Sequence, residues 1–361
     1  MNEINAILRK YILTAFIMSP ILVFAEDPTG SSKDSSEIAQ NDGPSLHNEE
    51  MTKVFMASQL KDSNRLFATG EILLWKAQQE DLSFAVKSAS TTSIQRGKTK
   101  DPKFNWDFGF RVGLGYNIPH DNWDVSASYT QFQTQSHTQE YAPSGGAIFP
   151  TWEYAGVASD YVTKATANWR LHLQLGDLEL GKAIGVSKWL SIRPHIGVRS
   201  AWIFQKYKIQ YSGGTAVASG DRDDVNMTNN FLGIGGRVGM DSVWGLCPGF
   251  SIFGDGALSL LSGFFAVHQT EQLKNAGTTY VNLSYHPKNV VTMFDLALGF
   301  QYDQFFSRKK YHLGVKLGYE FNYLFDQTQF MKFISGNPGS FNSSNGDLSL
   351  MGVTLGFRFD F

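Results

Sequence analysis

The feature that most restricts the fold of this chain is a strict alternation of apolar with polar or very small residues over long stretches. In residues 104–117 the apolar positions are Trp106, Phe108, Phe110, Val112, Leu114 and Tyr116. The same period of two recurs in residues 165–175, 190–204 and 313–325. Successive side chains of a β-strand point to opposite faces. The alternation therefore predicts strands that each have one apolar and one polar face.

The length of these stretches indicates a membrane barrel. Strands of globular proteins are most often about 5 or 6 residues long, whereas a tilted strand needs about 9 to 11 residues to cross a bilayer. Only 18% of the residues are charged and 35 are Gly, which fits a glycine-rich β-protein. We therefore predict an all-β, antiparallel, up-and-down transmembrane barrel of about 12 to 16 strands in residues 65–361. Its apolar faces would meet lipid, its polar faces would line a lumen, and aromatic residues such as Trp169, Trp189 and Trp202 would form girdles.

The last strand carries the most specific pattern. Counting back from the C-terminus, apolar residues occupy every second position at Phe361, Phe359, Phe357, Leu355 and Val353. This resembles the terminal signal of bacterial outer-membrane proteins, which the barrel assembly machinery reads. An unpaired edge beside such a face would aggregate. We therefore expect the last strand to close the barrel against the first one, near residues 67–77.

The first residues indicate export. Arg9 and Lys10 precede a short apolar run, and Val23 and Ala25 suit a cleavage site, so residues 1–25 read as a signal peptide. A membrane anchor is the alternative, but the run is shorter than the roughly 20 residues that a helical span needs. Residues 26–64 form an acidic, largely disordered arm with one possible short helix. The arm could plug the lumen or merely connect.

Sequence motifs for catalysis or metal binding are weak. The single Cys excludes a Cys-based zinc cluster, and the 8 His are scattered without a His-Glu-x-x-His pattern. The glycine-rich stretch 233–239 lacks the strand–helix context of a dinucleotide loop, so it reads as a strand. A net charge of −2 gives no argument for nucleic-acid binding. We expect no catalytic residue, metal or cofactor, and no enzyme, although sites on barrels assemble from distant strands.

The polar strand faces supply the candidate pore-lining residues. The cations among them are Arg111, Arg170, Arg193, Arg199, Arg237, Lys316 and Arg358, and the anions are Asp107, Asp295, Glu320 and Asp360. The excess of positive charge predicts a water-filled pore with a mild anion preference. Alternatively, these residues pair across the lumen and only stiffen the wall.

Several stretches resemble one protein family. They are residues 70–76, 82–86, 104–116, 123–125, 129–130, 177–181, 191–197, 230–235 and 260–263. In order and spacing they are similar to the Legionella-type major outer membrane protein family. The resemblance implies a pore-forming protein of the bacterial outer membrane, reached after export. Related proteins are disulfide-linked at the surface, but here only Cys247 is available, which allows at most one bridge in a homo-oligomer.

Two functions remain open from the sequence. The first is passive diffusion of small hydrophilic solutes through the barrel. The second is a structural or adhesion role of a plugged barrel, carried by the polar stretches 135–160, 213–226, 269–288 and 330–347, which we expect to be long loops. In either case the expected partners are outer-membrane lipid and the barrel assembly machinery.

Overall fold

The computed structural model describes residues 65–94, 97–119, 122–154, 161–215, 217, 220–306, 310–333 and 341–361. The described residues form strands and connections but no helix, so none of them belongs to an apolar helix that could cross a membrane. The expected signal peptide and the acidic arm lie outside the described residues.

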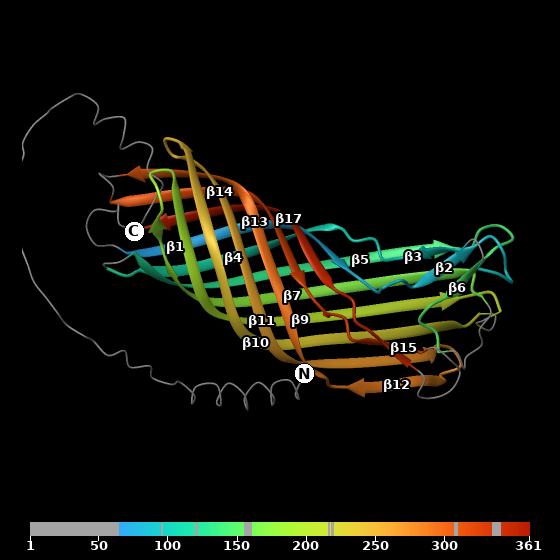
Figure 1. Ribbon diagram of the computed structural model, residues 1–361. Helices are drawn as coiled ribbons and strands as arrows, with labels where there is room; N and C mark the ends of the chain where they lie inside the picture. The colour runs from blue at the N-terminus through green and yellow to red at the C-terminus, as the bar shows by residue number, and fades with distance from the viewer. Residues whose placement is uncertain are drawn as a thin grey trace, which may run out of the picture. The chain divides into compact units, whose positions relative to one another are not determined.

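Ten antiparallel strands form a closed barrel (Figure 1). Around the barrel they are β1 (Leu66–Gln79), β4 (Trp106–Asn117), β5 (Trp123–Tyr141), β7 (Lys164–Lys182), β9 (Leu190–Ser212), β10 (Arg222–Cys247), β11 (Phe250–Leu273), β13 (Lys288–Phe306), β14 (Tyr311–Leu324) and β17 (Leu348–Asp360). All but one of these neighbours follow each other along the chain. The remaining pair, β1 with β17, closes the barrel from Phe67 opposite Asp360 to Gln79 opposite Leu348. The all-β barrel fold and its closure through the last strand are confirmed.

The barrel has fewer and longer strands than the 12 to 16 expected. The sheet itself contains 12 strands, but β8 (Ile184–Gly185) and β12 (Thr279–Tyr285) each pair with one neighbour and add nothing to the closed circuit. Strand β10 has 26 residues and β11 has 24. Such strands are longer than a bilayer crossing requires. Residues that would have formed additional strands instead lengthen the ten strands of the barrel.

The extended strands also occupy parts of the expected loops. Residues 135–141 continue β5, residues 222–226 begin β10, and residues 269–273 end β11. Short strands lie in the remaining connections: β2 (Ala85–Ser88), β3 (Lys98–Lys100) and β6 (Ala147–Pro150) form one small sheet, and β15 (Phe330–Phe333) pairs with β16 (Phe341–Ser344). Figure 1 shows β2, β3, β6, β12 and β15 at the end of the barrel that lies away from the C-terminus.

The two ends of the barrel differ in their connections. One end has the brief connections 118–122, 183–189, 248–249 and 307–310, and we call the adjoining part the short-turn half. The other end has the connections 80–105, 142–163, 213–221, 274–287 and 325–347, and we call that part the long-loop half. Outer-membrane barrels have short turns on the periplasmic side and longer loops outside.

The two halves also place apolar residues on opposite faces. In the short-turn half, Phe108, Leu114 and Ile196 point outward and expose 74%, 66% and 64% of their surface, as lipid-facing residues do. In the long-loop half, Trp169 and Tyr207 point inward and are fully buried. Trp169 therefore belongs to an interior core rather than to a girdle. The long-loop half is built like a soluble protein, and the short-turn half like a membrane barrel.

Candidate functional site: a charged cavity inside the barrel

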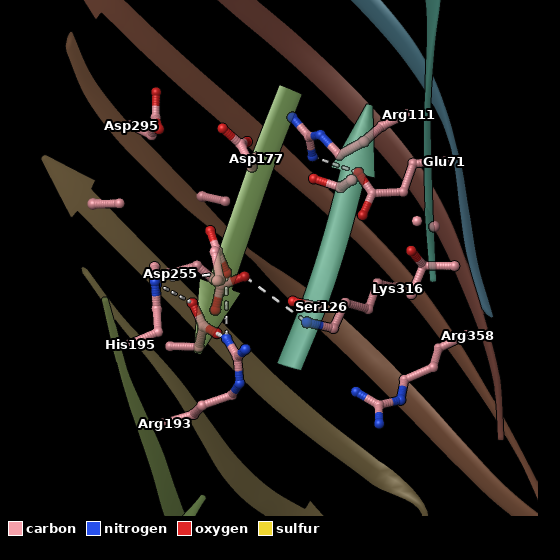
Figure 2. A pocket seen from close by; sticks show the side chains of 18 of the residues that line it. Glu71, Arg111, Ser126, Asp177, Arg193, His195, Asp255, Asp295, Lys316 and Arg358 are labelled. Atoms are coloured by element: carbon pink, nitrogen blue, oxygen red, sulfur yellow. Dashed lines mark hydrogen bonds and ion pairs between the residues drawn. The ribbon is translucent and has the colours of Figure 1, made fainter. Parts of the chain in front are cut away.

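A cavity of about 350 Å³ lies inside the short-turn half, and many charged side chains line it (Figure 2). Its wall includes eight carboxylates, namely Glu71, Asp124, Asp177, Glu179, Asp241, Asp255, Asp295 and Glu320. The Arg and Lys residues of the wall are Arg111, Arg193, Arg199, Arg237, Lys316 and Arg358, joined by His195. Carboxylates outnumber the Arg and Lys side chains. The excess of positive charge expected from the sequence is therefore absent from this cavity.

Arg111 on β4 joins three strands. Its guanidinium donates to Glu71 on β1 and, through Nη1 and Nη2, to both carboxylate oxygens of Glu320 on β14 at 3.1 Å. Nε donates to Thr130 Oγ1 at 3.0 Å. Figure 2 shows Arg111 and Glu71 directed toward each other. Because the planar guanidinium presents a fork of donors, one Arg can fix two carboxylates that come from different strands.

A second group centres on Asp295 of β13. Arg199 on β9 donates through Nη1 to Asp295 Oδ2 at 2.6 Å, and Arg237 on β10 donates to the same oxygen. Arg199 also holds Asp177 through Nε and Nη2 at 2.6 and 2.8 Å. Arg237 Nε reaches Glu179 Oε1 at 2.8 Å. The side chains of Arg199 and Asp177 are only 5% and 8% exposed, so these ions are compensated by each other rather than by water.

A third group lies nearer the short turns. Arg193 on β9 donates to both oxygens of Asp124 at 2.8 and 2.6 Å and to Asp241 Oδ2 at 2.8 Å. His195, two residues further along the same face, has Nε2 at 3.5 Å from Asp241 Oδ1 and Nδ1 at 3.6 Å from Glu179 Oε2. Figure 2 shows Arg193 and His195 on one side of the cavity. Each cation is shared between acids of two or more strands.

The remaining sequence-predicted residues also lie on the inner face, with one exception. Lys316 Nζ is 3.8 Å from Asp255 Oδ2, and Arg358 Nη2 is 2.8 Å from Asp360 Oδ1. Asp107 accepts a hydrogen bond from Thr134 at 2.5 Å but does not line the cavity. The exception is Arg170, which is exposed on the outer face of β7 between the buried residues Trp169 and Leu171. Its assignment to the pore lining is wrong.

Six acids of the cavity wall escaped the sequence analysis: Glu71, Asp124, Asp177, Glu179, Asp241 and Asp255. For Asp177 and Glu179 a signal was present, because they alternate with Leu178 and Leu180. These four residues continue the inward and outward faces of β7 beyond residue 175, where the inward face changes from apolar to acidic.

An apolar layer bounds the cavity toward the long-loop half. The next inward positions beyond Glu71, Asp177, Arg199 and Asp295 are buried and apolar, namely Leu73, Leu175, Ala201 and Met293. Trp75 lies behind Leu73, with its ring 5.6 Å from that of Phe132 and 5.7 Å from the Arg111 guanidinium. The apolar residues of this layer, with Trp75 and Phe132, belong to one continuous apolar core and form its end nearest the cavity.

Connections fill the barrel beyond this layer. Tyr207 and Tyr211 on β9 donate from their hydroxyls to the carbonyl oxygens of Leu82 and Phe84, both at 2.6 Å. Asn229 on β10 donates to the carbonyl oxygen of Gln327 at 2.7 Å, and Phe330 packs against Trp152 at 6.0 Å. We call residues 82–85, 147–152 and 327–331 the plug segments. They pack on the inner wall as a core does, so the lumen of the long-loop half is occupied.

Among the described residues, no three or more His, Cys, Asp or Glu side chains are arranged to hold a metal ion. Cys247 is exposed beside the connection between β10 and β11 and makes no disulfide within the chain. Its bridge to another chain stays a prediction.

A closed, antiparallel barrel with an apolar outer belt and a charged interior defines a bacterial outer-membrane protein. The family model described as "Legionella pneumophila major outer membrane protein precursor" matches residues 62–361. The chain belongs to this family, which confirms the resemblance seen in the sequence. No curated protein sequence matches it significantly.

Solved structures of similar fold are outer-membrane barrels. The outer membrane protease OmpT from Escherichia coli is 10% identical with a TM-score of 0.40, over 84% of this chain and all of that one. A FadL homologue from Pseudomonas aeruginosa is 7% identical with a TM-score of 0.25, over 82% and 90%. The toluene transporter TbuX from Ralstonia pickettii is 9% identical with a TM-score of 0.20, over 83% and 90%.

One sequence-based expectation is corrected by this comparison. We expected no enzyme, but a protease is among the barrels of similar fold, so the fold class includes catalysts. At this identity the likeness concerns the fold alone and assigns no activity to the chain.

Proposed function

We propose that the protein is a structural surface barrel of the outer membrane, whose long-loop half stands outside the bilayer as a folded, plugged cap. The observation that carries this proposal is the packed interior of that half. Trp75, Trp169 and Phe231 are buried there together with the plug segments. A native core of this kind is close-packed and has few voids larger than a water molecule. The polar connections at its outer end would provide the contacts of an adhesion or scaffold surface.

Planar-bilayer recording tests this role. The refolded mature protein should insert as a heat-modifiable barrel and show no discrete conductance steps. A variant without residues 327–331 should conduct, because it lacks the segment that Asn229 and Trp152 hold. A matched variant without residues 274–278, which connect β11 and β12 outside the core, should stay silent. Steps of constant size from the unmodified protein would overturn the plugged role.

Porin-like diffusion of small hydrophilic solutes is the second candidate. The cavity of the short-turn half supports it, because its charged wall suits water and ions. In that case the plug segments would have to move aside. The eight carboxylates of the wall then favour a weak cation preference, in place of the mild anion preference expected from the sequence. The sign of the reversal potential under a salt gradient distinguishes the two preferences.

The route to the membrane is proposed on the sequence alone. We infer export through a signal peptide at residues 1–25, then assembly by the barrel machinery through the terminal pattern Phe357, Phe359 and Phe361. In the closed barrel Phe357 and Phe359 point outward and are 44% and 43% exposed, which supports a role as an accessible apolar signal.

A further inference from the structure

Arg170 on β7 lies directly opposite Lys206 on β9, and both side chains are exposed on the outer face of the barrel. Like charges at directly opposed positions of an antiparallel pair destabilise the sheet. The residues that flank the pair on the next strands are uncharged, namely Gln135 on β5 and Thr228 on β10. Within the described part of the chain, neither Arg170 nor Lys206 has an acidic partner.

One acid on this face, on the neighbouring strand β10, is already engaged. Asp224 on β10 lies 2.6 Å from Arg222 Nε and 3.7 Å from Lys208 Nζ. Lys208 follows Lys206 on the same face of β9, and it lies opposite Asn168 on β7. The face therefore carries a row of cations in which Arg170 and Lys206 form the uncompensated part.

The pair sits where the apolar belt ends. Along the outer face of β9 the residues Ile196 and Val198 are exposed and apolar, Trp202 and Phe204 follow, and Lys206 is the next outward position. On β7 the exposed Leu178 gives way to Gln174, His172 and Arg170 in the same direction. Aromatic residues mark the level of the membrane–water interface in barrels. Arg170 and Lys206 thus lie at the level of lipid headgroups, on the long-loop side.

We propose that Arg170 and Lys206 bind the phosphate groups of an anionic lipid headgroup in the leaflet on the long-loop side. The planar Arg fork binds phosphate oxygens in a bidentate manner, and Lys adds a point charge beside it. A bound phosphate would place negative charge between two cations that otherwise repel each other. The position directly beyond Phe204 favours a lipid over a free anion, because the acyl chains of the same molecule would cover the apolar belt below. This site is separate from the interior cavity and from the plugged role.

Native mass spectrometry of the full-length protein in detergent, titrated with diphosphoryl lipid A, tests the site. The unmodified protein should bind the lipid, and Arg170→Gln/Lys206→Gln should bind it at least 10-fold more weakly. The control Lys98→Gln/Lys274→Gln loses the same charge at exposed positions of the long-loop connections and should stay within 2-fold. Rising NaCl should weaken binding to the unmodified protein, since exposed charges are screened.

Two further arms keep the proposal falsifiable. Arg170→Glu creates an opposed ion pair with Lys206, so it should migrate as a folded, heat-modifiable barrel and yet lose lipid binding. Inorganic phosphate, added at the concentration at which lipid A saturates the protein, should displace little of the bound lipid. The proposal is overturned if the double Gln variant binds lipid A like the unmodified protein. Full displacement by inorganic phosphate would equally overturn it, because the site would then bind free anions.

Discussion

Arg199 on β9 and Asp295 on β13 meet inside the barrel, with Nη1 and Oδ2 2.6 Å apart, although two strands separate β9 from β13 in the sheet. Their contact therefore crosses the lumen instead of following the wall. Arg111 and Glu320 do the same from β4 to β14. Such links fix the cross-section of the short-turn half, where no apolar core is available to do so.

Removing one partner of this link should be costly. We expect Arg199→Met to lower the free energy of unfolding by about 3 to 5 kcal/mol, because it leaves Asp177 and part of the charge on Asp295 buried without a counter-ion. Urea titration of the protein in detergent, followed by tryptophan fluorescence, measures the change.

The matched control is Lys87→Gln. Lys87 pairs with Glu140 at 3.4 Å, its side chain is 31% exposed, and Lys100 also holds Glu140. Its loss should cost about 0 to 1 kcal/mol. Equal effects of the two substitutions would mean that the lumenal charges are solvated and do not depend on each other.

The sequence predicted the strands well wherever an apolar face meets lipid. Residues 104–117 and 313–325 became β4 and β14 with small shifts of their ends, and the terminal pattern correctly identified the closing strand. These predictions succeed because alternation is a local property, and a lipid-facing strand must keep it over its full crossing.

Arg170 shows where local information ends. Alternation places Arg170 and His172 on one face of β7 and Trp169 and Leu171 on the other, but it does not say which face points inward. That choice depends on whether the segment lies within the bilayer or beyond it, which the other nine strands decide. Residues 135–141 were predicted to be a loop for a related reason. This part of β5 lies outside the lipid, so its outer face carries polar residues and the alternation that identifies a strand is missing.

Two adjacent glycines of β10 should respond differently to substitution. A Cβ on Gly235, which faces inward, would run into the carbonyl oxygen of Leu260, whereas a Cβ on Gly236 would meet no atom within 4 Å. We expect Gly235→Ala to cost about 1 to 3 kcal/mol, since the strand pair must separate. Gly236→Ala should stay within about 0.5 kcal/mol. Refolding yield and urea midpoints in the same detergent compare them, and a harmless Gly235→Ala would show that β10 and β11 can shift apart freely.

A buried acidic cluster in the long-loop half should make stability depend on pH. Asp223 and Glu271 are fully buried beyond the apolar belt, and both carboxylate oxygens of Asp223 lack a hydrogen-bond partner among the described residues. Burial, together with repulsion from the neighbouring acids, raises the pKa of Glu153 to about 8, of Asp223 to about 7 and of Glu271 to about 8. Glu271 also accepts the backbone N–H of Tyr154 at 2.9 Å.

The sign follows from proton binding. Between the ordinary carboxyl pKa of about 4 and the raised values of about 7 to 8, the folded protein holds more protons than the unfolded chain. Stability should therefore fall as pH rises through this window and level off above it. Asp223→Asn should flatten the decline and stabilise the protein by about 1 to 3 kcal/mol at pH 8, as measured by thermal unfolding from pH 5 to 9.

Asp221 is the matched control for that substitution. It is partly exposed, and the backbone N–H groups of Asn275 and Arg222 hold its pKa below the usual value. Its contribution to stability is present above the ordinary carboxyl pKa and is lost only as pH falls through its lowered value. Asp221 is the smallest of the three influences that raise the pKa of Asp223, so Asp221→Asn should leave most of the decline between pH 5 and 8 in place. A decline that survives Asp223→Asn unchanged would exclude Asp223 as its source.

The terminal aromatic residues should act in assembly more than in stability. Phe359 points outward, its ring stacks on Tyr311 at 6.1 Å and on Phe361 at 5.9 Å, and its backbone is paired on both sides by β1 and β14. An acidic side chain near the membrane interface costs at most about 1 kcal/mol. Phe359→Asp should thus refold into lipid vesicles nearly as well as the unmodified chain. In cells it should reach the outer membrane at less than about a tenth of the normal level, if the terminal strand is the assembly signal.

Phe306→Asp, at an exposed position of similar level on β13, is the control and should assemble normally in both settings. An equal loss for both variants in cells would trace the effect to the lipid face and leave the terminal strand without a special role.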